Sequence, residues 1–219
     1  MDLMAIRRSL MIGQKPTGRL PRGFREVEYL ESTGTQYIAN VIAGNLPKSW
    51  MEVEFMVMAG SPGNTQFIGT TLDNKNAVPK IAFESVINLR QDHNISLLRR
   101  VSDTRIKIST DAMNKVYVND SYVTTINDIT TAQSGYNLFS VHPNMMKYAS
   151  KARLYYFRLI SSNGNVIDLV PCVSKSDNKP GMYDLCGSIC PLTNSPFYIN
   201  GGTGEFIPGP EIYYWEDAA

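Results

Sequence analysis

Acidic residues recur at strand spacing in two parts of the sequence, and they are the first candidates for chemistry. Glu26, Glu28 and Glu31 lie close together, and Glu52 and Glu54 form a second group. Residues at i and i+2 share one face of a β-strand, so such a pair could supply the acid and the nucleophile of a retaining glycoside hydrolase. Glutamate alternating with apolar residues is also typical of the solvated face of a half-buried strand. We adopt this second interpretation and predict no catalytic residue.

The chain offers few ligands for a transition metal. His93 and His142 lie far apart in the sequence, and Cys186 and Cys190 are accompanied only by the remote Cys172. A structural zinc site needs four ligands in paired spacings, and these residues do not supply them. The sequence therefore predicts packed free thiols and no zinc site.

Calcium and phosphate sites have equally weak support. Asp73–Asn74 and Asn119–Asp120 contain suitable oxygens but are typical turn residues. The glycine-rich stretch Asn200–Gly204 leads into Glu205–Pro208, whereas a phosphate-binding loop leads into a helix. No Gly-x-Ser-x-Gly motif is present. The sequence therefore predicts a protein that is not an enzyme and needs no metal or cofactor.

Binding of a sugar without hydrolysis needs an aromatic platform surrounded by polar groups. The candidates by residue type are Trp50, Tyr37 and Tyr148, followed by Tyr155 and Tyr156. The alternative is that these rings pack in the core, as tyrosines in strands usually do. We retain Trp50, Tyr37 and Tyr148 as candidate glycan contacts.

The elements that would position these residues are β-strands. In Trp50–Met58 four apolar residues alternate with Glu52 and Glu54, which predicts a half-buried strand. Lys115–Ile126, with Asn119–Ser121 at its centre, predicts a hairpin, and so do Ala152–Ile160 and Val166–Val170 around an Asn-Gly turn. Further strands are expected over Arg105–Ser109, Tyr136–Val141 and Phe197–Ile199. The predicted class is all-β, arranged as a two-sheet sandwich.

Composition narrows the function. The chain has 219 residues, 43% of them hydrophobic, which is enough for a substantial core. A formal net charge of +1 argues against a strongly basic nucleic-acid-binding protein. No apolar run reaches 18 residues, so no membrane span is expected. Because Arg7 and Arg8 interrupt the first apolar stretch, no signal peptide is expected, and we expect the chain to be made in a cytoplasm.

The two ends differ from the middle of the chain. Leu3, Ile6 and Leu10 recur at helical spacing, with Arg7 and Arg8 off that stripe. Prolines, glycines and basic residues then form a linker, so residues 1–22 are expected to be a short helical or extended anchor, or else a frayed tail. Residues 23–210 would form the sandwich.

An aromatic tail closes the chain at residues 211–219. Tyr213, Tyr214 and Trp215 follow Pro208-Gly209-Pro210. These aromatic residues either pack back on the domain or meet a neighbouring subunit, because aromatic side chains dominate interface energetics.

Two stretches are specific enough to indicate a family. The first is Leu20–Ile38, LPRGFREVEYLESTGTQYI. The second combines Asp168–Cys172, Gly181–Asp184 and Phe197–Pro210, the last reading FYINGGTGEFIPGP. Together they resemble concanavalin A-like (laminin-G-like) jelly-roll proteins of tailed bacteriophages and of prophages of gut bacteria. The segment Leu185–Pro196 is longer than is usual in that family.

The resemblance implies a jelly-roll virion protein, located on the particle and made in the bacterial host cytoplasm. It would be a head fibre, a capsid decoration or a tail-associated adhesin, with other virion proteins as partners and host-surface carbohydrate as a candidate ligand. It supplies no catalytic residue, and it places Glu26, Glu28 and Glu31 in the family's opening strand rather than in the catalytic strand of laminarinase-type glucanases. A homo-oligomer is expected, with no nucleic acid and no membrane as partner.

Two alternatives stay open. One is a glucanase-like enzyme that uses Glu26, Glu28 and Glu31, or Glu52 and Glu54, and it predicts carboxyl groups about 5–5.5 Å apart in an open cleft. The other is a purely structural protein that stabilises a shell and binds no sugar. A shared fold cannot distinguish these functions.

Overall fold

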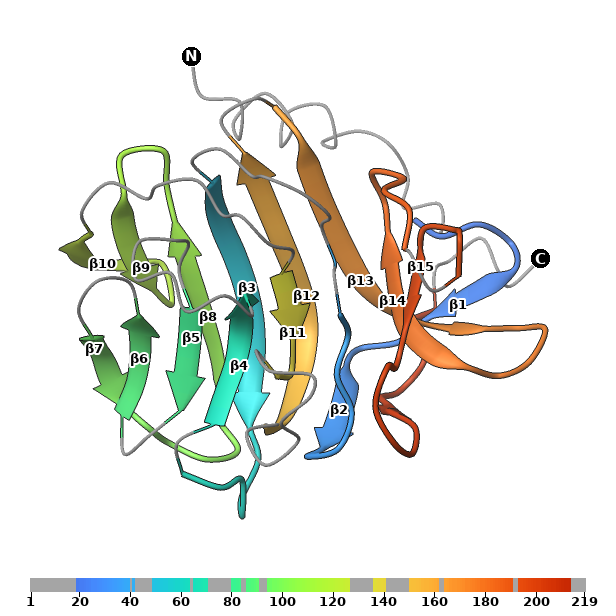
Figure 1. The fold of residues 1–219 in the computed structure, drawn as a ribbon, viewed down its shortest axis with the longest axis horizontal. Helices are drawn as coiled ribbons and strands as arrows, with labels where there is room; N and C mark the ends of the chain where they lie inside the picture. Colours follow the sequence, from blue (N-terminus) through green and yellow to red (C-terminus); the bar gives the residue numbers. More distant parts are fainter. Residues whose placement is uncertain are drawn as a thin grey trace.

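The chain folds into two packed layers of antiparallel strands (Figure 1). The structure is a computed structural model, and it describes residues 19–39, 41, 49–63, 65–70, 80–83, 86–90, 94–126, 136–140, 150–161, 164–190 and 193–213. The described residues contain no helix. Predicted anchor residues Leu3, Ile6, Arg7, Arg8 and Leu10 lie outside the described residues.

The larger layer holds most of the strands. Its continuous path is β10 (Ser121–Thr125), β9 (Lys115–Val118), β8 (Arg105–Thr110), β3 (Ser49–Val57), β12 (Lys151–Ser161), β13 (Val166–Ser174), β14 (Pro180–Asp184) and β15 (Phe197–Ile199). Off this path, β1 (Phe24–Glu26) pairs with β13, β2 (Leu30–Thr33) with β12, and β16 (Ile207–Pro208) with β2.

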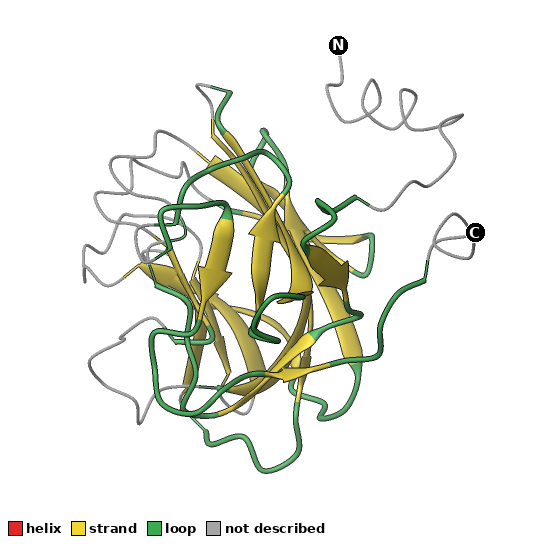
Figure 2. Cartoon of the chain, turned by 90° about the vertical axis from the view of Figure 1, so that its right-hand side faces the viewer, coloured by secondary structure: helices red, strands yellow, loops and turns green. Residues whose placement is uncertain are grey.

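The smaller layer covers one face of the larger one. Its order is β11 (Tyr136–Leu138), β4 (Thr65–Thr70), β5 (Lys80–Phe83), β6 (Val86–Arg90) and β7 (Asn94–Arg99). Figure 2 shows the two layers of strands. The prediction of an all-β antiparallel sandwich is confirmed, and the arrangement is consistent with a jelly roll.

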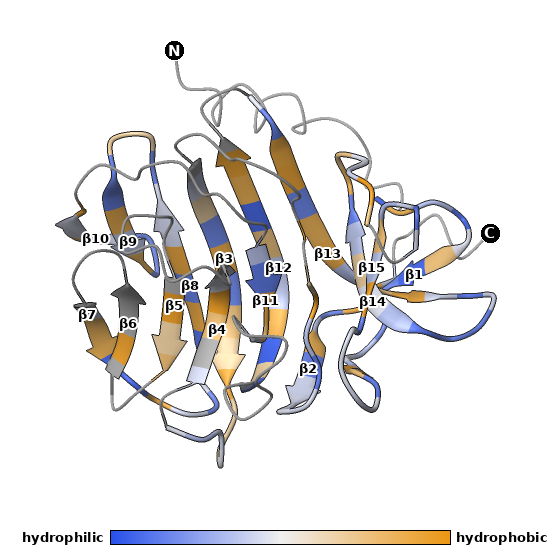
Figure 3. Ribbon diagram, viewed as in Figure 1, coloured by the Kyte–Doolittle hydropathy of each residue, from blue (hydrophilic) through white to orange (hydrophobic). Residues whose placement is uncertain are grey.

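The β3 strand shows why the sequence folds this way. Met51, Val53, Phe55 and Val57 are fully buried, whereas the residues between them are half-buried on the opposite face. This alternation is the predicted one, and Figure 3 shows similar apolar and polar bands along β12 and β13. Period-two patterning therefore separates a core face from an outer face across the larger sheet.

Aromatic side chains join the two layers. Phe55 from the larger sheet contacts Phe67 and Phe83 from the smaller one, with ring centroids 5.1 and 5.4 Å apart. Phe139 meets Phe67 edge-on at 5.4 Å. All four rings are fully buried, so this cluster provides much of the packing between the sheets.

The predicted hairpins are confirmed. Lys115–Val118 pairs with Ser121–Thr125 around Asn119 and Asp120, whose φ angles of 49° and 64° are those of a two-residue hairpin turn. Asn119–Asp120 therefore serves as a turn. The second hairpin pairs β12 with β13.

A close backbone approach joins two distant segments of the chain. Thr203 N donates to Thr35 O at 3.2 Å, and Gly201 N donates to Tyr37 O at 2.9 Å. A Cβ at Gly202 would lie 2.2 Å from Thr35 O, so only glycine fits there. The two stretches that carry the family resemblance are thus held together by mutual packing.

We expect Gly202→Ala to lower the free energy of unfolding by about 1–3 kcal/mol, because the new methyl group must displace the Thr35 backbone. Gly63→Ala is the matched control: its Cβ would meet nothing within 4 Å, and its effect should stay within about 0.5 kcal/mol. Chemical denaturation of both variants measures the difference. Equal stabilities would contradict the close approach.

Candidate functional site

The first and last described segments of the chain run side by side. Ile207 and Pro208 pair with Glu31 and Leu30, and a further bridge joins Glu211 to Val27. Ile212 N then donates to Glu26 O at 2.9 Å. The pairing extends two residues into the predicted aromatic tail. The first and last described residues therefore lie at the edge that carries β1, on the right of Figure 1.

An ion pair holds the predicted linker against this edge. Glu26 is buried, with 4% of the residue exposed. Its carboxylate pairs with the guanidinium of Arg19, and Arg19 Nε lies 3.3 Å from Glu26 Oε2. Beneath it, Cys172 is the cross-strand partner of Glu26. Burial, together with the charge of Glu26, raises the pKa of the Cys172 thiol. Arg19, which lies in the predicted linker, is therefore fixed to the sandwich.

The described part of the tail ends in an exposed residue. Arg25 and Glu211 form a second ion pair across it, at 3.6 Å. Tyr213 is 77% exposed, so its ring does not pack back on the domain. Tyr214 and Trp215 lie outside the described residues, and their role stays a prediction.

The outer face of the larger sheet carries the candidate catalytic glutamates. Glu52 lies 3.3 Å from Lys107 Nζ and accepts a hydrogen bond from Tyr156, and Glu54 pairs with Arg105. Burial alone would lower the pKa of Lys107. The hydrogen bonds to Asp120 and Glu52 and the charges of these carboxylates outweigh burial, so the pKa of Lys107 is raised. The Tyr156 hydroxyl has its pKa raised by burial and by Glu52.

The first group of glutamates is also paired with cations. Glu28 lies 3.4 Å from Arg105, and Glu31 lies 2.7 Å from Arg153. Together with Glu26 and Arg19, all five candidate carboxylates therefore contact a basic side chain. This arrangement supports the interpretation that they belong to charge-paired strand faces.

Two tyrosines between these charges are covered by guanidinium groups. Arg105 lies 3.9 Å from the ring centroid of Tyr155, and Arg153 lies 4.3 Å from that of Tyr29. The two rings meet edge-on at 5.6 Å. Because cations cover them, these rings offer little free face for stacking on a sugar.

The predicted glycan contacts are not brought together. Trp50 is half-buried on the outer face and pairs with Ile160 near one end of β12. Tyr37 follows β2, and the last residue of β2, Thr33, pairs with Lys151 at the other end of β12. A Cβ on Gly201 would lie 2.9 Å from the ring of Tyr37, so Tyr37 packs against the glycine-rich loop. Tyr148 lies outside the described residues.

A small pocket lies beside this loop, and its lining includes a side chain that holds the loop in shape. It measures about 180 Å³, and its lining includes Lys179, Asn200, Glu205 and Phe206. Asn200 Oδ1 accepts from Tyr37 N and Gly202 N, and Asn200 Nδ2 donates to Gly204 O. Asn200 thus uses both its amide oxygen and its amide nitrogen to shape the loop.

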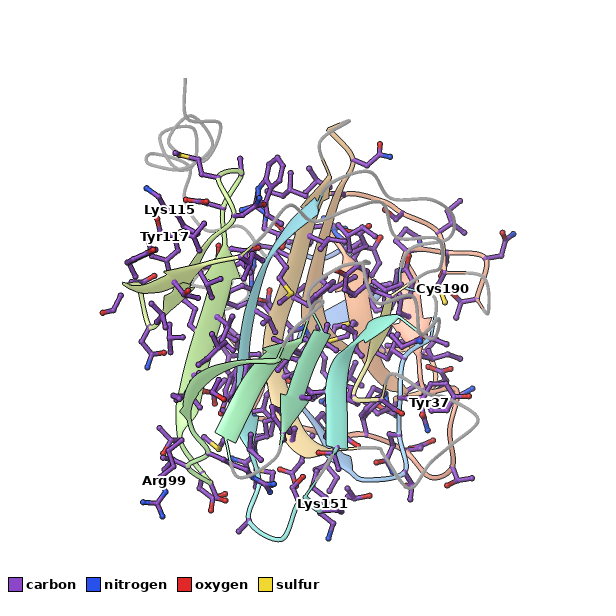
Figure 4. The ribbon with its side chains drawn as sticks, turned by 60° about the vertical axis from the view of Figure 1, so that its left-hand side comes forward. Tyr37, Arg99, Lys115, Tyr117, Lys151 and Cys190 are labelled. Atoms are coloured by element: carbon purple, nitrogen blue, oxygen red, sulfur yellow. The ribbon has the colours of Figure 1, made fainter. Side chains whose placement is uncertain are left out.

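Sequence reasoning missed an aromatic pair on the β9–β10 hairpin. Tyr117 and Tyr122 meet edge-on with ring centroids 6.0 Å apart, and Tyr122 is 57% exposed. Figure 4 shows Tyr117 and Lys115 on the side of the molecule away from Tyr37 and Cys190. The alternation within the predicted hairpin could have revealed this pair, because it places both tyrosines on the face opposite to that of the buried Val116.

Metal ligands do not converge within the described part of the chain. No group of three His, Cys, Asp or Glu residues there could hold a metal ion, and His93 and His142 lie outside it. The buried carboxylate of Asp184 instead accepts hydrogen bonds from the backbone N–H groups of Asp168, Cys186 and Ser188. Asp184 thereby shapes the start of the long Leu185–Pro196 segment.

The comparisons with known proteins assign no family. No family model matches the chain, and no curated protein matches it. Among the described residues, no helix is long and apolar enough to cross a membrane.

Glu26→Gln should lower the free energy of unfolding by about 1–3 kcal/mol, because it replaces a charge-assisted contact at a buried position. Glu205→Gln, at an exposed position, is the matched control and should change stability by less than about 0.5 kcal/mol. Denaturant titration of both proteins provides the measurement. An unchanged Glu26→Gln protein would show that Arg19 does not hold the linker in place.

The three thiols should differ in reactivity. Cys186 is exposed, whereas Cys172 and Cys190 are buried. Alkylation requires an accessible thiolate, and burial raises the pKa of Cys172. At neutral pH iodoacetamide should modify Cys186 in the native protein, and the other two only after unfolding, as read by peptide mass spectrometry. Rapid native modification of Cys172 would contradict its burial.

Proposed function

We propose that this chain is a non-enzymatic structural protein of a tailed bacteriophage particle, displayed on the particle surface as a head fibre, capsid decoration or tail-associated adhesin. Segments at both ends of the sandwich would attach it to other virion proteins. Host-surface glycan is the proposed ligand of the exposed part. The resemblance of Leu20–Ile38 and Phe197–Pro210 to phage jelly-roll proteins supports this assignment.

The observation that carries the proposal is the meeting of the two chain ends at Glu26. Arg19 contacts its carboxylate, and Ile212 bonds its carbonyl oxygen. The described part of the chain therefore begins and ends at one edge of the sandwich. A domain held there would keep the β9–β10 end, at the far side of the larger sheet, free to face outward (Figure 1).

The distribution of charge agrees with a role in binding rather than catalysis. All five candidate carboxylates contact cations, and Tyr156 also bonds Glu52. Attachment of many copies would work through avidity, since weak single contacts become strong when several are made together.

Deletion of residues 1–18 should abolish co-sedimentation with virions or shells that lack this protein, because the linker and its apolar stripe would be lost. A matched variant, Leu3→Ala/Ile6→Ala/Leu10→Ala, removes only the stripe and should weaken binding in the same direction. Arg7→Ala/Arg8→Ala separates a charge contribution from the apolar one.

The same proteins are then incubated with intact host cells. Cell binding by the truncated chain would support the adhesin form of the proposal, and binding to shells alone would support capsid decoration. Full shell binding after the deletion would overturn the assignment of the N-terminal segment as the anchor.

A further inference from the structure

The β9–β10 hairpin extends a row of side chains across the outer face of the larger sheet. Glu52 pairs with Ser109, Ser109 with Tyr117, and Tyr117 with Tyr122. Directly paired residues of antiparallel strands point to the same face. The two tyrosines therefore lie on the outer face, at the edge of the sheet.

Trp50 belongs to the same surface. It lies two residues before Glu52 on β3, and residues two apart share a face. Adjacent strands are about 4.8 Å apart, so Tyr117 lies about two strand spacings from β3, with the small side chain of Ser109 between them. Ser109 thus has Tyr117 beside it on β9 and Glu52 beside it on β3, and Trp50 lies diagonally from it, two residues before Glu52. We call Trp50, Ser109, Asp111, Tyr117 and Tyr122 the hairpin face.

Polar groups on the hairpin face are held in fixed positions. Asp111 Oδ1 accepts from the backbone N–H groups of Met113 and Lys115, each at 2.9 Å. Tyr117 donates its hydroxyl hydrogen to Asp111 Oδ2 at 3.2 Å, and the Tyr122 hydroxyl lies 3.0 Å from Thr125 Oγ1. These contacts orient the carboxylate and both phenols before any ligand arrives.

Charges beside the hairpin face are already paired. Lys107 Nζ lies 3.3 Å from Glu52 and 2.8 Å from Asp120. A charged ligand would have to compete with these contacts. An uncharged ligand with many hydroxyl groups meets no such competition, because hydroxyls can bond the edges of carboxylates and phenols without displacing a partner.

The edge strand itself disfavours a protein partner. β10 is exposed and carries no charged residue, and these two features alone would favour pairing with another chain. Its register with β9 shifts between Tyr122 and Thr124, however, and such a bulge bends the edge away from regular pairing and redirects side chains. The irregularity occurs at Tyr122, the most exposed ring of the surface.

We propose that the hairpin face binds a neutral glycan. The exposed ring of Tyr122 and the half-buried ring of Trp50 on the same face supply apolar surfaces for the C–H side of sugar rings. Asp111 and the phenols supply hydrogen bonds to hydroxyls. The inference rests on the proposed function only for the source of the glycan, the host cell surface. It replaces Tyr37 with Tyr117 and Tyr122 as the partners of Trp50.

The test uses the purified full chain and a panel of neutral oligosaccharides of glucose, galactose, mannose and N-acetylglucosamine, with hyaluronate as the anionic arm. Affinity is measured by titration calorimetry. Tyr122→Ala and Trp50→Ala should each weaken binding to a neutral oligosaccharide by about tenfold or more. Tyr122→Phe keeps the ring and should retain most of the affinity.

Ile189→Ala is the matched control, because Ile189 is 61% exposed, close to the 57% of Tyr122, but lies in the Leu185–Pro196 segment. The affinity of this variant should equal that of the parent chain. Circular dichroism verifies that each variant is folded. Since Tyr122 is largely exposed, its truncation should leave the thermal transition unchanged.

Three results would overturn the inference: no neutral oligosaccharide bound at millimolar concentration, hyaluronate bound in preference, or neutral binding that survives both truncations. Sedimentation velocity adds a fourth, because a dimer lost in Tyr122→Ala would show that the edge pairs with a second copy. Attachment to shells is read separately, so a failed anchor would refute the proposed function and leave glycan binding by the isolated chain intact.

Discussion

The antiparallel pairing of residues 207–212 with residues 26–31 is the constraint on which the layout of the molecule depends. It closes the chain on itself, since the last described segment pairs with β2 and with the residues that join β1 to β2. Such a pairing between distant segments is slow to form and costs loop-closure entropy. The close approach of Gly202 to Thr35 joins the same two parts of the chain, and its contacts offset part of this entropic cost.

The outer face of the larger sheet has two regions in which aromatic side chains have different surroundings. Toward β2, Arg105 and Arg153 cover the rings of Tyr155 and Tyr29 and pair with glutamates. Toward β10, Tyr117 and Tyr122 have no guanidinium over them among the described contacts, and their hydroxyls are oriented by neighbours. The same residue types thus produce a closed, charge-paired region at one end and an open aromatic surface at the other.

Local patterns predicted the strands well because their causes are local. Alternation in β3 and the Asn119–Asp120 turn follow from the pleat and from positive φ angles, which short windows of sequence reveal. The contact of Arg19 with Glu26 could not be predicted, because a basic residue in a Pro/Gly-rich stretch is equally compatible with a free linker. The hairpin face was missed for a different reason: Trp50, Ser109 and Tyr117 come onto one face only through the register of β3, β8 and β9.

Because both ends emerge at one edge, the sandwich has the geometry of an insertable module. Domains whose termini lie close together tolerate circular permutation and insertion into a surface loop of another protein. A short loop could join Arg19 to Tyr213 while new ends are opened at an exposed turn such as Asp177–Lys179, which is solvent-facing between β13 and β14. The fold could therefore be grafted onto an unrelated scaffold without extending either end across the β9–β10 side.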